Sequence, residues 1–209
     1  MITKSRHHRI FYNIFRLFYA EWKINRHFHA VNIMGSFQER NLPVLIIANH
    51  VSWWDGLWVM LLNIRLLNRK FHFMMLSEQM KKSRWFNYVG GYSVQKKSKS
   101  IIESLQYTLE LLSSNRNMVL LFPQGKIQSI YTPSIQFERG IDHILKRTKG
   151  NVQVLFLANM VDYFSNAKPT LYMYIQEYNY SGFVPGKVQT DYDSFYAQCT
   201  REQTNKVEA

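Results

Sequence analysis

His50 and Asp55 are the two residues whose types and spacing could carry out chemistry together. A hydroxyl group is a poor nucleophile at neutral pH. An imidazole can accept its proton, while a carboxylate on the other ring nitrogen fixes the tautomer and the orientation. Five positions along a continuous helix turn through about 500°, which would point the two side chains in different directions. The pair therefore requires His50 in a turn and Asp55 in the first turn of a following helix.

The residues between them indicate such a break. Ser52-Trp53-Trp54-Asp55 has the pattern of a capping box, with Ser52 as the N-cap and Asp55 three positions later. The same pattern allows a purely structural interpretation, in which Asp55 only satisfies the helix start and His50 bonds to backbone. Residues 42–48 just before the pair are apolar and typical of a strand buried on both faces, a position that favours the catalytic interpretation.

The rest of the chain alternates between strand and helix patterns. Strands are expected over residues 30–35, 42–48, 71–76, 90–94, 118–122, 152–160 and 170–178, the last one alternating and so nearer an edge of the sheet. Helices are expected over residues 8–29, 53–67, 78–86, 98–113 and 137–149, with a polar helix starting near residue 191 or 193. This order predicts an α/β fold with a mixed, partly parallel sheet flanked by helices, after an N-terminal amphipathic helical segment.

In such sheets ligands bind beyond the carboxyl ends of the strands. That rule selects two turns, residues 49–55 and residues 123–126, because they follow the two most apolar strands. The second turn reads Pro123-Gln124-Gly125-Lys126. Both turns carry residues capable of chemistry.

The excess of positive over negative charge lies in the first half of the chain. The net charge is +12, and residues 1–100 hold 16 Lys and Arg against 4 Asp and Glu, whereas the second half is balanced. This asymmetry predicts an anionic partner on one side of the molecule, such as phospholipid headgroups, nucleic acid or an acidic substrate.

Residues 8–29 carry part of that charge on a helical pattern. Apolar residues recur at spacings of three and four (Ile10, Phe11, Ile14, Phe15, Phe18 and Trp22) among the bases Arg9, Arg16, Lys23 and Arg26. This is typical of a helix lying in a membrane interface, although the stripe could instead pack on its own domain. No run is apolar enough for a membrane span or a signal peptide. We therefore expect a basic membrane-surface helix over residues 1–30, peripheral attachment, and a catalytic domain over residues 31–209.

Cysteine and histidine usage bears on the compartment and on metals. The only cysteine, Cys199, allows no internal disulfide, which is consistent with a reducing compartment and hence the cytoplasmic face of the membrane. The histidines near the N-terminus, His7, His8, His27 and His29, have no carboxylate or thiol beside them in a ligand pattern. No metal or other cofactor is expected.

Four blocks of residues match a known family in order. Residues 49–55, Asn-His-Val-Ser-Trp-Trp-Asp, resemble the N-H-x-S-x-x-D motif of the glycerophospholipid acyltransferases, which include the 1-acylglycerol-3-phosphate acyltransferases. Residues 91–96 resemble the block that ends in a basic residue, here Lys96. Residues 122–125, Phe-Pro-Gln-Gly, resemble the F-P-E-G motif, and residues 137–140 resemble the F-K-x-G segment that follows it.

This resemblance implies direct transfer of an acyl group from acyl-CoA or acyl-acyl carrier protein to a lipid hydroxyl, as in phospholipid biosynthesis, with no acyl-enzyme. His50 would be the general base and Asp55 would orient it. The substrate-binding residues implied are Asn49, Ser52, Lys96, Phe122, Pro123, Gln124, Gly125 and Lys126. The partners implied are an acyl thioester or its carrier protein, a lipid acceptor and a membrane surface with anionic lipids, not nucleic acid.

Three departures from the family motifs concern the acceptor. Gln124 replaces a glutamate, Lys126 stands where a small hydroxyl residue is usual, and Lys96 replaces an arginine. Together they favour an acceptor whose head differs from the common lysophosphatidate, either a more anionic lipid or a non-phosphate lipid. The alternative from another class is a non-catalytic protein whose basic, aromatic first half binds anionic lipid or nucleic acid.

Overall fold

The computed structural model describes residues 2–95, 100–179 and 183–207. It has one seven-stranded sheet in the order β1-β7-β6-β2-β5-β3-β4. The strands are β1 (Ala30–Met34), β2 (Val44–Ala48), β3 (Lys70–Leu76), β4 (Gly91–Val94), β5 (Asn117–Leu121), β6 (Gln153–Asp162) and β7 (Thr170–Tyr178). All neighbouring strands pair in parallel except β6 and β7. The predicted mixed, partly parallel α/β fold is confirmed.

The central strands are apolar at every position because both faces of the sheet are covered. In β2, Val44, Ile46 and Ala48 pack into the core on one face, and Leu45 and Ile47 pack into the core on the other. Such two-sided burial is what a continuous apolar run in a parallel sheet predicts. His50 follows the last residue of β2 by two positions and therefore lies at the carboxyl ends of the strands.

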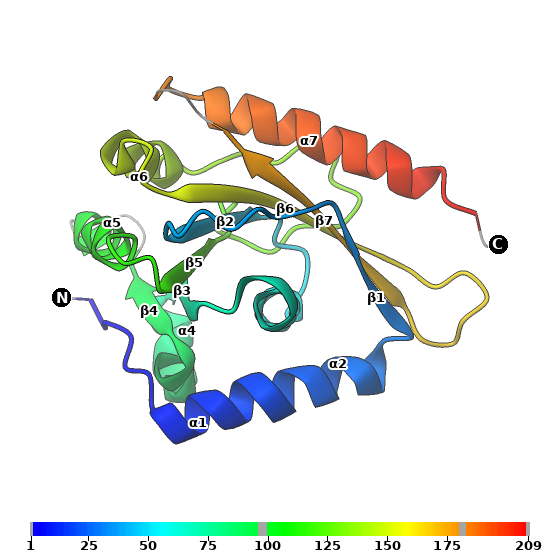
Figure 1. The fold of residues 1–209 in the computed structure, drawn as a ribbon, viewed down its shortest axis with the longest axis horizontal. Helices are drawn as coiled ribbons and strands as arrows, with labels where there is room; N and C mark the ends of the chain where they lie inside the picture. The colour runs from blue at the N-terminus through cyan, green and yellow to red at the C-terminus, as the bar shows by residue number, and fades with distance from the viewer. Residues whose placement is uncertain (1, 96–99, 180–182, 208–209) are drawn as a thin grey trace.

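Different sets of helices cover the two faces of the sheet. On one face lie the N-terminal helix and α3 (Asp55–Leu62), which continues as η2 (Asn63–Leu67). The other face is covered by α5 (Ser100–Leu111), α6 (Gly140–Thr148) and α7 (Lys187–Thr204), as Figure 1 shows. Two short helices, α4 (Ser77–Lys82) and η3 (Arg84–Val89), join β3 to β4. Because β2, β5 and β3 are parallel, the turns that follow them lie at the same end of the sheet.

The N-terminal helix combines α1 (Arg9–Ile14), the π-helical segment η1 (Phe15–Ala20) and α2 (Glu21–His27). Ile10, Ile14, Phe18 and Trp22 are 67%, 52%, 68% and 56% exposed. A row with a spacing of four drifts around an α-helix of 3.6 residues per turn, and the wider π-helical turn counteracts this drift. The opposite side of the helix packs into the core through Tyr12, Phe15, Ala20 and Ile24. The packing interpretation therefore holds for the inner side of the helix, and membrane contact of the exposed row stays a prediction.

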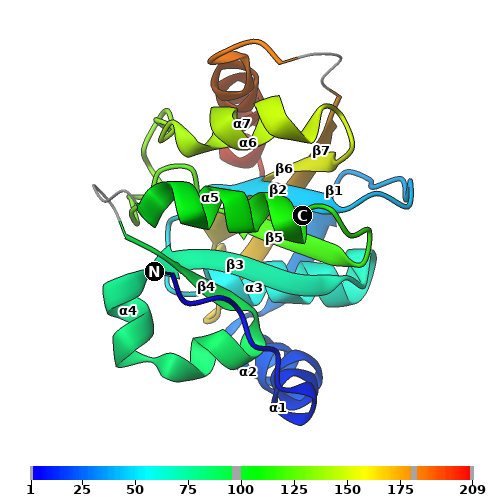
Figure 2. The same ribbon diagram turned by 90° about the vertical axis from the view of Figure 1, so that its left-hand side faces the viewer.

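The residues before this helix run along the edge strand β4 (Figure 2). The N–H of Ser93 donates to the carbonyl of Thr3 at 3.0 Å, and the N–H of Arg6 donates to that of Asn87 at 3.0 Å. This extended segment satisfies part of an open sheet edge. Nothing in the sequence pattern predicted it.

Strand β7 lies near an edge of the sheet, as predicted, with the edge strand β1 on its outer side. Two predicted helix starts are wrong. Helix α3 starts at Asp55 rather than residue 53, and α7 starts at Lys187, earlier than residue 191. Across the described residues, no helix is both long and apolar enough to span a bilayer.

Candidate active site

His50 and Asp55 are in direct contact. The Nδ1 atom of His50 lies 2.7 Å from Oδ2 of Asp55, with His50 in the turn after β2 and Asp55 at the first position of α3. The same carboxylate oxygen accepts the backbone N–H groups of Val51 at 2.7 Å and Ser52 at 2.9 Å. The turn is therefore wrapped around the Asp55 carboxylate, and this is how a spacing of five brings the two side chains together.

Only one of the two hydrogen bonds of the predicted capping box is present. Asp55 reaches back to the Ser52 N–H as the pattern requires. The Oγ atom of Ser52, however, accepts the N–H of Trp54 at 3.1 Å rather than that of Asp55. Because the helix begins at Asp55, Ser52 caps the turn that precedes it.

The two members of the pair differ in exposure. The Asp55 side chain is fully buried, whereas 24% of the His50 side chain is exposed. Burial raises the pKa of the Asp55 carboxyl, and the hydrogen bonds from His50, Ser52 and Val51 oppose that rise by favouring the carboxylate. With Nδ1 of His50 bonded to Asp55, Nε2 is the nitrogen left to accept a proton.

Phe122 fixes the plane of the imidazole. Its ring stacks on that of His50 with centroids 4.0 Å apart and an angle of 10° between the planes. Phe122 directly follows β5, and β5 is the neighbour of β2. The two turns selected from the sequence therefore meet, which the sequence alone did not predict.

Gln124 and Gln128 join the second turn to the backbone of His50. The N–H of His50 donates to Oε1 of Gln124, and the N–H of Gln128 donates to the carbonyl of His50 at 2.9 Å. The Gln124 amide also donates to Oε1 of Gln128 at 2.6 Å. Gly125 closes the turn with φ of +62°, a conformation that glycine adopts without strain. Both the N–H and the carbonyl group of His50 are thus hydrogen-bonded to the segment that follows β5.

Other predicted substrate-binding residues are placed differently. Asn49 is fully buried, and its amide pairs with the backbone N–H and carbonyl of Asn159 at 2.8 and 2.9 Å. Pro123 is buried and accepts the N–H of Glu138 at 2.8 Å. Lys126 is exposed beside the second turn. Lys96 lies outside the described residues.

Two residues that position the site were missed from the sequence. Gln128 lies in a polar stretch with no motif, and Asn159 lies within the apolar strand β6. Asn159 acts through its backbone N–H and carbonyl, and its own side-chain amide is buried without a hydrogen-bond partner, so its residue type gave no signal for this contact.

The N-terminal helix borders the site. The ring of His27 lies 5.1 Å from that of Trp54, and Nζ of Lys23 lies 5.8 Å from the centre of the Trp53 ring. Trp53 itself is 56% exposed. Basic and aromatic side chains of the helix are therefore placed next to the turn that carries His50.

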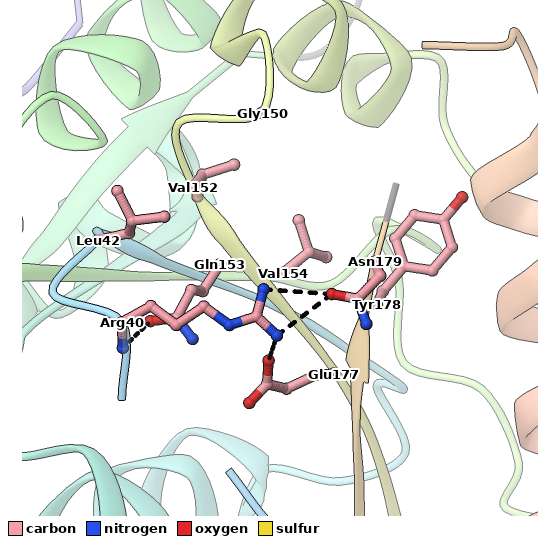
Figure 3. A pocket seen from close by; sticks show the side chains of 9 residues that line it. All are labelled: Arg40, Leu42, Gly150, Val152, Gln153, Val154, Glu177, Tyr178 and Asn179. Carbon is pink, nitrogen blue, oxygen red and sulfur yellow. Dashed lines mark hydrogen bonds and ion pairs between the residues drawn. The ribbon is translucent and has the colours of Figure 1, made fainter. Parts of the chain in front are cut away.

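The cavity in Figure 3 is remote from this chemistry. It has a volume of about 210 Å³ and is lined by residues such as Leu42 and Val152, which precede β2 and β6 at the opposite edge of the sheet. The Arg40 guanidinium there donates to Glu177 at 2.7 Å and to Asn179 at 3.3 Å. A second cavity, of about 430 Å³, lies between β7 and α7. His50 lines neither cavity. In the described part of the chain, no three His, Cys, Asp or Glu side chains are grouped as metal ligands.

Comparisons with known proteins agree with the geometry. The family description Acyltransferase matches residues 30–160. The crystal structure of the 1-acyl-sn-glycerophosphate (LPA) acyltransferase PlsC from Thermotoga maritima superposes with a TM-score of 0.62. It is 13% identical in sequence, and the match covers 96% of this chain and 81% of the other. A search of curated proteins found no significant match.

Proposed function

Since the chain belongs to the acyltransferase family, we propose that it moves an acyl chain from acyl-CoA or acyl-acyl carrier protein to a hydroxyl of a lysophospholipid-like or other lipid acceptor. The observation that carries this proposal is the 2.7 Å contact between Nδ1 of His50 and Asp55. It leaves Nε2 as the basic nitrogen on a partly exposed ring, at the edge of the sheet where ligands of α/β proteins bind.

The reaction follows from these positions. Nε2 of His50 accepts the proton of the acceptor hydroxyl as its oxygen forms a bond to the thioester carbonyl carbon. Collapse of the tetrahedral intermediate breaks the C–S bond, and the leaving thiolate takes the proton from the His50 imidazolium. Asp55 holds the ring and stabilises its positive charge during the transfer. No acyl-enzyme forms, and the base returns to its neutral state.

The second turn supports the choice of acceptor. Lys126 is exposed next to the Gly125 turn, so its ammonium group is able to bind an anionic head. The likeness to a lysophosphatidate acyltransferase fold is consistent with a phosphate-bearing acceptor. Gln124 contributes by holding the His50 backbone, because its amide is already engaged. Binding by Lys96 stays a prediction.

The exposed row on the N-terminal helix supports attachment to a membrane. Four large apolar side chains at positions 10, 14, 18 and 22 face outward, and Lys23 and Arg26 lie over the rings of Trp53 and Trp22. Aromatic and basic residues together favour the interface of an anionic bilayer. We infer that the exposed side of the helix over residues 9–27, rather than the whole of residues 1–30, lies on the membrane surface and brings the site to its lipid acceptor.

Release of free thiol from acyl donors tests the proposed reaction. Each donor, acyl-CoA or acyl-acyl carrier protein, is paired with lysophosphatidate or with a non-phosphate lipid bearing a free hydroxyl. We expect release only when donor and acceptor are both present, with one acylated lipid formed per thiol. Thiol release that is independent of every acceptor would identify a thioesterase and contradict transfer.

A further inference from the structure

The loop that joins β6 to β7, residues 163–169, carries exposed aromatic side chains on an unusual backbone. Tyr163 is 56% exposed and Phe164 is 38% exposed. The N–H of Asn166 donates to the carbonyl of Tyr163 at 2.9 Å, which closes a four-residue turn with Phe164 at its first central position.

Phe164 adopts φ of +46° in this turn. Turns with positive φ at that position normally contain glycine, because a side chain is crowded there. For a bulky residue the conformation is strained, and such strain gathers at functional positions. Glycine would adopt this φ without strain. A partly exposed phenylalanine at this position therefore indicates a role in contact with another surface.

The position of the loop links it to the active site. Strand β6 runs parallel to β2, so the loop leaves the sheet at the same edge as the turn that carries His50. The N–H of His29 donates to the carbonyl of Pro169 at 2.8 Å, which joins the end of the loop to the end of α2. Figure 1 shows the loop projecting beyond the junction of α2 and β1.

The composition of the loop favours a lipid surface as its partner. Lys168 is the only charged residue in the sequence of the loop and is exposed. Phenylalanine, tyrosine and lysine without acids match the interface of an anionic bilayer, where rings enter the headgroup region and the ammonium group stays in water.

We propose that loop 163–169 is a second lipid-contacting element, which inserts Tyr163 and Phe164 into an anionic bilayer beside the N-terminal helix. This inference rests on the membrane attachment proposed above. It adds a contact next to the end of α2, so that the helix and the loop engage the bilayer together.

Replacing Phe164 by glycine separates this role from a structural one. The Phe164→Gly variant removes the strain at positive φ, so its melting temperature should equal or exceed that of the wild type. Its binding to vesicles of phosphatidylglycerol and phosphatidylcholine should be about three- to tenfold weaker. Asn41→Gly is the matched control, because Asn41 also has positive φ, at +57°, and lies before β2 at the other edge of the sheet. It should bind vesicles like the wild type.

A fluorescent label reports insertion directly. The only native thiol, Cys199, is 3% exposed, and burial raises its pKa to about 12, so a cysteine introduced at the surface reacts selectively. A polarity-sensitive dye on Phe164→Cys should shift to shorter wavelength when these vesicles are added. The same dye on Asn41→Cys should not shift.

The outcomes distinguish the loop from the helix. If the wild type binds vesicles but Phe164→Gly binds equally well and the dye does not respond, the loop inference is wrong and helix attachment stands. If the wild type does not bind, membrane attachment itself is wrong. A dye shift that appears without lipid and grows with protein concentration would assign the loop to contact between two copies of the chain. If Phe164→Gly is destabilised, the dye response alone decides.

Discussion

The backbone N–H of His50 donates a hydrogen bond to the side chain of Gln124, which lies 74 positions further along the chain. The bond joins the turns after the adjacent strands β2 and β5 at the residue assigned as the base. Gln124 is only 4% exposed. Its substitution for the glutamate of the family motif therefore changes the interior of the site.

Replacing Gln124 by leucine should slow turnover. The His50 N–H would lose its buried acceptor, at a cost of about 1–3 kcal/mol, and the imidazole would no longer be held in place. We expect kcat to fall about ten- to hundredfold with little change in KM. Gln124→Glu keeps an oxygen acceptor for the N–H and should retain most of the activity. An unchanged kcat in folded Gln124→Leu would contradict the positioning role.

Removing the charge of Lys126 should affect binding of the acceptor more than the chemical step. For an anionic acceptor, Lys126→Ala should raise KM about five- to tenfold, because one charge-assisted contact is lost. An uncharged lipid acceptor should show no such change. Lys146→Ala, an exposed lysine on α6, serves as the control. Equal effects on both acceptor classes would show that Lys126 does not bind the head.

The outer face of the N-terminal helix should govern vesicle binding. Phe18 and Trp22 are 68% and 56% exposed, so replacing both by serine should leave the melting temperature unchanged. Sedimentation with anionic vesicles should fall about tenfold or more. Ile102→Ser on α5, across the sheet, is an exposed apolar control that should bind normally. Deleting the whole helix is a poorer test, because Ile24 and Ala20 are fully buried.

Acid should destabilise the protein through His72, which is buried, and His7, which is half-buried. His7 and His72 lie 4.6 Å apart between the N-terminal segment and β3. Burial lowers the pKa of His7 to about 4 and that of His72 to about 3, and Lys70 acts in the same direction. The unfolded chain therefore binds these protons first, near the ordinary pKa of 6.5.

The free energy of unfolding should accordingly be constant above pH 6.5 with respect to these groups. It should fall by about 1.4 kcal/mol per pH unit for each histidine as the pH drops from there towards 4. Denaturant titrations across this range measure the slope, which should be shallower in His72→Gln and unchanged in His29→Gln. An identical slope in all three proteins would assign acid sensitivity to other groups.

The pattern of the sequence was sufficient for the fold class because local periodicity decides it. The fully apolar run in β2 and the alternation of elements require a covered, mostly parallel sheet. The position of β7 near an edge was also predictable, because alternation reports one less buried face. Pairing of β1 with β7 joins residues 140 positions apart, which no local signal encodes.

The candidate site was predictable only where its residues lie in one turn. The contact between His50 and Asp55 followed from spacing and capping chemistry, because both belong to the same turn. The bonds of His50 to Gln124 and Gln128, and of Asn49 to Asn159, join segments from different strands. Interactions of that kind depend on sheet order, and sheet order is not visible in sequence periodicity.

One rate comparison decides whether His50 is the base of an acyl transfer. Acceptor-dependent thiol release is measured for the wild type, His50→Ala and the control His143→Ala, whose histidine lies on α6 across the sheet. With equal melting temperatures, we predict that His50→Ala is slower by about 10²–10⁴-fold and that His143→Ala matches the wild type. A folded His50→Ala protein that transfers acyl chains at the wild-type rate would contradict the assignment.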